Sequence, residues 1–97
     1  MSDSPEGDAR RAAAFSLGLL RQAAGLDKDA KAYYQQAADL GDGPAAVNLA
    51  GMLMDEGDRD GATRWLRAVI DDDADEAATR MARRNLRLME QNRVWQG

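Results

Sequence analysis

The fold is decided by a short stretch that this chain uses twice. Ala13–Gly18 reads AAFSLG, and Ala45–Ala50, 32 residues later, reads AAVNLA. The same offset aligns further small and apolar positions, which are Gly25 with Gly57, Ala30 with Ala62, Tyr33-Tyr34 with Trp65-Leu66, and Ala37-Ala38 with Val69-Ile70. A repeat of this length predicts a helical hairpin that cannot bury its apolar face alone and therefore stacks on a neighbouring hairpin.

The amino-acid composition excludes most common types of enzyme active site. The chain has 97 residues, enough for one small domain, and it contains neither Cys nor His. Disulfides, thiolate or imidazole metal sites, catalytic thiols and histidine bases are therefore excluded. The acidic first residues lack a signal-peptide pattern, and no stretch reaches the roughly 20 apolar residues of a membrane span. We expect a cytoplasmic protein with no membrane contact, no cofactor and no catalytic residue.

The charge is divided unevenly along the chain. The net charge of −4 argues against nucleic-acid binding. Residues 1–78 carry eight basic and sixteen acidic side chains, whereas residues 79–97 carry five arginines and one acid, Glu90. This split predicts an acidic body with a basic C-terminal end.

Acidic residues at expected helix N-termini and glycines at expected helix C-termini predict five helices and no strand. A flexible segment, residues 1–7, precedes a repeat domain at 8–91, and a tail follows at 92–97. The domain divides into hairpins 8–41 and 42–73 and a capping helix 75–91. Predicted helix starts follow Asp8, Asp27, Asp42-Gly43-Pro44, Asp58 and Asp75, and the first three helices end at Gly25, Gly41 and Gly57.

Helical spacing of apolar residues predicts the buried side of four of these helices. The first helix buries Ala13, Leu17, Leu20 and Ala24; the second, Ala30, Tyr33, Tyr34, Ala37 and Ala38; the fourth, Ala62, Trp65, Leu66, Val69 and Ile70; the fifth, Ala78, Met81, Ala82, Asn85, Leu88 and Met89. Gly18 and Gly51 each cost a helix about 1 kcal/mol relative to alanine, which predicts close approach of the paired helix at both positions.

These residues resemble the tetratricopeptide and Sel-like repeat families over about residues 11–90. Leu17-Gly18, Ala30, Tyr34 and Ala37 fit the tetratricopeptide spacing, and Lys31–Gly41 followed by Ala45 and Asn48–Ala50 is similar to the Sel-like pattern. The repeat departs from both patterns. Its period is 32 residues rather than about 34, and it lacks the longer loop of the Sel-like family. The resemblance implies a short α-solenoid, a right-handed superhelix of two antiparallel hairpins plus a capping helix, which binds a protein or peptide and catalyses nothing.

In these families the first helix of each hairpin lines the concave surface. Carried over by position, the resemblance implies a groove with an apolar floor and a basic wall. Its predicted partner-binding residues are Phe15, Ser16, Leu19, Gln22, Val47, Asn48, Met54, Arg80, Arg83 and Arg87, with Gly51, Asp55 and Thr79 beside them. Asn48 occupies a position where related repeats hold a peptide backbone through an amide, which both donates and accepts.

Each of these assignments has an alternative. Phe15, Leu19, Val47 and Met54 can instead pack between hairpins, and the arginines of the last helix can form a solvated face or bind a carboxylate or phosphate. The run Asp71–Glu76 offers oxygen ligands for calcium, but it lacks the spacing and central glycine of a calcium loop, which favours a solvated turn and helix caps. For the whole protein, the alternative to a peptide-binding adaptor is a homo-oligomer that joins its acidic body to the basic end of another copy.

Overall fold

The structure, a computed structural model, describes residues 5–96, with the side chains of residues 6–91. Within that range the chain forms five α-helices and no strand, as the sequence predicts. They are α1 (Pro5–Ala23), α2 (Asp27–Asp39), α3 (Gly43–Asp55), α4 (Arg59–Asp72) and α5 (Glu76–Gln96).

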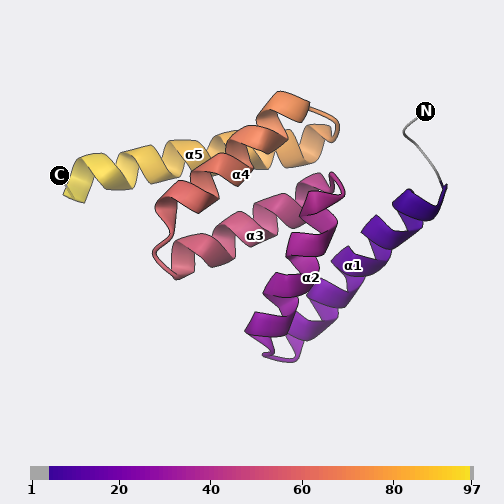
Figure 1. The fold of residues 1–97 in the computed structure, drawn as a ribbon. Helices are drawn as coiled ribbons and strands as arrows, with labels where there is room; N and C mark the ends of the chain where they lie inside the picture. Colours follow the sequence, from indigo (N-terminus) through magenta and orange to yellow (C-terminus); the bar gives the residue numbers. More distant parts are fainter. Residues whose placement is uncertain (1–4, 97) are drawn as a thin grey trace.

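Helices that are neighbours in sequence pack on each other. α1 packs on α2, α2 on α3, α3 on α4 and α4 on α5, and α5 also contacts α3. Figure 1 shows α1 at one edge of the molecule, with α2 on one side and no helix on the other. α3 therefore has neighbours on several sides, whereas α1 has one main neighbour.

Glycines and aspartates set most helix boundaries as predicted. Gly25, Gly41 and Gly57 have φ angles of 80°, 92° and 85°, the left-handed region that ends a helix at little cost for glycine. Carboxylates accept hydrogen bonds from the free backbone amides at the starts of α3, α4 and α5. These bonds join Asp42 to Ala45 at 2.8 Å, Asp58 to Gly61 at 2.9 Å and Asp75 to Ala78 at 3.0 Å.

The first two predicted starts are wrong. α1 begins at Pro5, ahead of Asp8, whose carboxylate accepts from Arg11 at 2.8 Å within the helix. α2 has Leu26 as its N-cap with no side-chain hydrogen bond, so Asp27 is the first helical residue rather than the cap. Residues 1–4 of the predicted flexible segment lie outside the described residues.

The C-terminal boundaries also shift. α4 continues through Asp71 and Asp72, which the sequence assigned to a turn, and ends where Asp73 adopts a left-handed φ of 47°. α5 continues past the predicted end at Gln91 to Gln96, so the predicted tail at 92–97 is helical as far as it is described.

The 32-residue offset reappears as matched burial. Ala30 and Ala62 are fully buried, and Tyr34 and Leu66 fill equivalent places at the centre of their helices. Further buried pairs at this offset are Ala14 with Ala46 and Ala37 with Val69. Tyr33, Trp65 and Ile70, predicted to be buried, are only half-buried.

The predicted buried side of α1 is wrong. Its buried residues are Ala14 and Gly18, whereas Leu17 is 36% and Leu20 66% exposed. A Cβ on Gly18 would lie 2.6 Å from two ring carbons of Tyr34, so the close approach predicted there is confirmed. α1 thus meets α2 through Gly18 and Phe15, both of which face Tyr34, and leaves its leucines largely exposed.

Candidate groove between α3 and α5

Two adjoining hollows form a shallow groove between α3 and α5, which we call the α3–α5 groove. The first, of about 360 Å³, is lined by Gln22 of α1, Val47, Asn48, Gly51, Met52 and Asp55 of α3, and Met81 and Asn85 of α5. The second, of about 290 Å³, is lined by Ala50, Gly51, Met54, Asp55, Leu66, Asn85, Leu88 and Met89. Gly51, Asp55 and Asn85 line both hollows, so the two lie side by side.

Gly51 opens the middle of this groove. A Cβ placed on it would meet nothing within 4 Å, so the close helix approach predicted at this position is wrong. Glycine inside a helix costs roughly 1 kcal/mol relative to alanine, and here no packing offsets that cost. The missing side chain leaves free space at the point where the two hollows join.

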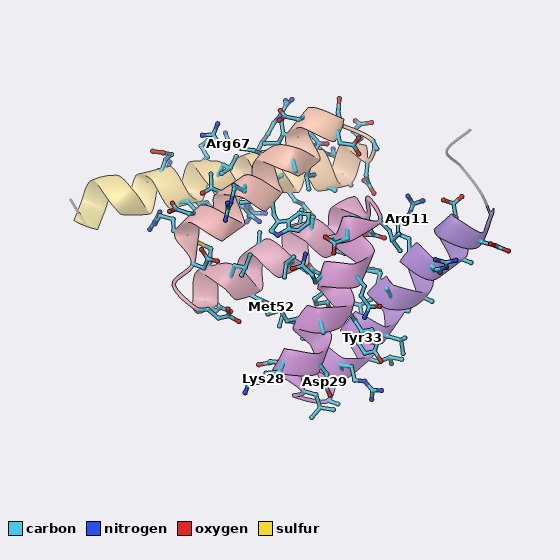
Figure 2. All side chains as sticks on the ribbon, viewed as in Figure 1. Arg11, Lys28, Asp29, Tyr33, Met52 and Arg67 are labelled. Carbon is cyan, nitrogen blue, oxygen red and sulfur yellow. The ribbon has the colours of Figure 1, made fainter. Side chains whose placement is uncertain are left out.

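Methionine dominates the apolar lining. The chain has five methionines, and four of them, all except Met1, line the groove: Met52, Met54, Met81 and Met89. In Figure 2, Met52 lies at the edge of α3 that faces away from α4, whereas Arg67 lies on the outer side of α4. Unbranched, polarisable methionine side chains adapt to irregular apolar partners.

Polar groups are few, and some already have partners. Tyr34 donates a hydrogen bond from its hydroxyl to Oε1 of Gln22 at 2.7 Å. Burial raises the pKa of Tyr34, and a hydrogen bond from the Asn48 side chain partly offsets this rise. Gln22 and Asn48 therefore hold the tyrosine as well as lining the groove, while Asp55 is the one ionisable side chain among the described residues that line it.

The structure brings together about half of the predicted binding residues. Gln22, Val47, Asn48, Gly51, Met54 and Asp55 line the groove, although Val47 is only 4% exposed and contributes little surface. Phe15 packs instead on the core with its ring centroid 6.0 Å from that of Tyr34, and Ser16 and Leu19 are exposed on α1 outside both hollows.

The predicted basic wall lies elsewhere. Arg80, Arg83 and Arg87 are exposed, and none of them lines either hollow. Thr79 is only 5% exposed, and its hydroxyl has no hydrogen-bond partner. α5 contributes Met81, Asn85, Leu88 and Met89 in their place.

A one-residue shift explains this difference. The capping residues Asp42 and Asp75 are 33 positions apart, not 32. One residue rotates a position by about 100° around a helix, which is enough to move a side chain from the groove to another face. Aligning the caps rather than the apolar stretches would have matched Met81 to Asn48 and Leu88 to Asp55.

A separate hollow of about 240 Å³ lies at the other edge of α3, between α2, α4 and the turn before α5. Trp65 and Val69 form part of its apolar lining, and Asp42 and Asp75 stand at its rim. Both carboxylates are already engaged as helix caps. This hollow therefore lies between helix ends, and the fold itself uses its two rim carboxylates.

The groove holds amide, carboxylate and apolar groups, a set that suits binding. Among the residues that the structure describes, no group of three acidic side chains could hold a metal ion, and none of the helices could cross a bilayer. No family model matches the chain, and no curated protein or solved structure matches it.

Proposed function

We propose that this chain is a non-catalytic interaction module, a short α-solenoid of the tetratricopeptide or Sel-like kind, which binds a segment of a partner protein in the α3–α5 groove. The observation that carries the proposal is Gly51, an exposed glycine in mid-helix whose only structural consequence is open space at the centre of the groove. The free space at Gly51 can take a side chain of the partner between the two hollows.

The lining defines the segment that would fit. The methionines and Leu88 offer two apolar patches, one at each end, for apolar side chains of the partner. Asp55, at the junction, favours a basic side chain between them. Asn85 beside it can donate to and accept from the partner's polar groups.

Selection of peptides from a random display library tests this proposal, because it requires no known partner. We expect selected peptides to combine apolar residues with Lys or Arg and to lose at least roughly tenfold in affinity against Gly51→Trp, which fills the junction. Gly51→Ala takes up only part of this space, so it should weaken binding by less than Gly51→Trp. Equal affinity for wild type and Gly51→Trp would overturn the groove assignment.

Asp55→Lys separates charge recognition from shape. A lysine there repels a basic peptide without filling the hollow, so we expect weaker binding that grows weaker still at low salt. The same reversal at Asp29, an exposed residue of α2 that lines neither hollow, should leave binding unchanged.

A further inference from the structure

The hydroxyl of Tyr34 lies where α1, α2 and α3 meet. Tyr34 is fully buried on α2, and its hydroxyl donates to Oε1 of Gln22 on α1 at 2.7 Å. The same oxygen has a second hydrogen bond with the side chain of Asn48 on α3. Both amide residues line the first hollow of the α3–α5 groove, whereas Tyr34 lines neither hollow. The tyrosine therefore holds two residues of the groove from the core side without reaching the groove itself.

The single hydrogen of this hydroxyl sets the direction of both amides. Because Oε1 of Gln22 accepts that hydrogen, the hydroxyl can meet Asn48 only as an acceptor, and Asn48 donates to it through Nδ2. Nε2 of Gln22 and Oδ1 of Asn48 remain, and neither atom has a hydrogen-bond partner among the described residues. The lining of the first hollow thus includes one residue with a free donor group and one with a free acceptor group.

The same three positions one repeat later carry no polar side chain. They are occupied by Met54, Leu66 and Met81, when α5 is aligned through its capping residue. Where Leu66 replaces Tyr34, methionine also replaces both amides. The hydroxyl and the two amides therefore differ together between the repeats, as expected of groups that act as one unit.

The backbone of an extended segment matches this pair of groups. In an extended chain the N–H and the C=O of one residue lie on the same side, as in the pairs that antiparallel strands exchange. Nε2 of Gln22 can donate to such a C=O, and Oδ1 of Asn48 can accept from the N–H of the same residue. Since both amides contact one hydroxyl, their free groups lie near each other. A helical partner would not use them, because a helix bonds its own backbone groups.

We propose that the Tyr34 hydroxyl orients Gln22 and Asn48 so that together they bind the C=O and N–H of one residue in an extended partner segment. Tyr34 is then a positioning residue, since it fixes both amides without touching the partner. The inference rests on the proposed function, because the segment is the one bound in the α3–α5 groove.

Two adjacent tyrosines on α2 provide a matched test with a display-selected peptide. Tyr34→Phe removes only the hydroxyl and leaves both amides free to turn, so we expect the peptide to bind roughly threefold to tenfold more weakly. Tyr33→Phe removes the hydroxyl of a residue that lines neither hollow, and it should leave affinity unchanged. Circular dichroism checks that both variants keep their helices.

Ester substitution in the peptide tests recognition of the backbone. Replacing one backbone N–H at a time by an ester oxygen removes a single donor and leaves the peptide's side chains in place. At one position we expect roughly threefold weaker binding to the wild-type chain and no further loss against Asn48→Ala, which already lacks the acceptor. Coupling of Asn48 to an Asn or Gln side chain of the peptide, rather than to its backbone, would overturn the proposal.

The orientation of the amides can be measured without a peptide. In ¹⁵N NMR spectra of the free chain, Tyr34→Phe should shift the side-chain amide signals of Gln22 and Asn48, and Tyr33→Phe should not. Unshifted signals, or full affinity in Tyr34→Phe, would overturn this proposal. The proposed function would still stand if Gly51→Trp blocked the same peptide, whereas a peptide indifferent to Gly51→Trp would overturn both.

Discussion

α1 and α3 begin from similar sequences but have different surroundings. Ala13–Gly18 and Ala45–Ala50 align residue by residue, yet α3 buries six residues, among them Leu49, whereas the alanine-rich start of α1 buries only Ala14 and Gly18. The contacts explain the difference, because α3 has helices on both sides and α1 lies at the edge. An apolar stripe thus shows that a helix can pack on a neighbour. The position of that helix in the fold decides whether the stripe is covered.

Truncation of equivalent leucines should give the largest contrast between the two helices. Leu49→Ala removes a fully buried side chain and should lower the free energy of unfolding by about 2–5 kcal/mol. Leu17→Ala, its counterpart, should cost less, about 1–2 kcal/mol, since Leu17 is already 36% exposed. Urea unfolding at low concentration measures both, and equal losses would refute the difference in burial.

The two mid-helix glycines should respond in opposite directions. Gly18→Ala drives a methyl group into the Tyr34 ring and should destabilise the fold by about 1–3 kcal/mol. Gly51→Ala meets open space and should stabilise it by up to about 1 kcal/mol. Thermal unfolding compares them directly, and destabilisation by both would mean that Gly51 is packed.

Local chemistry made much of this fold predictable. Gly25, Gly41 and Gly57 take positive φ angles, and Asp42, Asp58 and Asp75 cap helices, because these roles depend on the residue and its close neighbours. The packing of α1 was not predictable in this way. Its leucine stripe and its Ala14-Gly18 side are both compatible with burial, and only the tertiary structure selects between them.

The candidate site was predictable on α3 and not on α5. Asn48, Gly51 and Asp55 follow from the register of the repeat itself. On α5 the spacing lengthens from 32 to 33 residues, so Met81 and Leu88 stand where the repeat predicts Arg80 and Arg87. An alignment of the apolar residues of α5 with those of α3 does not reveal the extra residue, because adjacent alanines allow a match at either spacing.

The starts of α2 and α4 offer a smaller contrast. Leu26 and Asp58 occupy equivalent N-cap positions, and only Asp58 accepts a hydrogen bond from its helix. Leu26→Asp should therefore stabilise the protein by about 0.5–1 kcal/mol, and Asp58→Ala should destabilise it by about 0.5–2 kcal/mol. Chemical denaturation tests both, and a stability loss in Leu26→Asp would mean that this turn cannot place a capping carboxylate.

The smallest expected effect is on stability at alkaline pH. It concerns Tyr34, which can ionise, in contrast to its counterpart Leu66, which cannot. Burial raises the pKa of Tyr34 above its ordinary value of 10.0, so the unfolded chain releases this proton first. The resulting contribution to stability is complete below pH 10 and is lost as the pH rises through the folded-state pKa. Tyr34→Phe, which like Leu66 cannot ionise, should show a weaker fall in stability above pH 10. Identical alkaline profiles would contradict the burial of this hydroxyl.

The most direct test of the binding site is an NMR titration of the ¹⁵N-labelled chain with a display-selected peptide. Our account predicts that the largest amide shifts fall on Gly51, Asp55 and Asn85, which line both hollows, while those of the exposed Leu17 and Leu20 on α1 stay small. Shifts centred on Leu17 and Leu20, or on Arg80, Arg83 and Arg87, would place the partner outside the α3–α5 groove and contradict the proposed function.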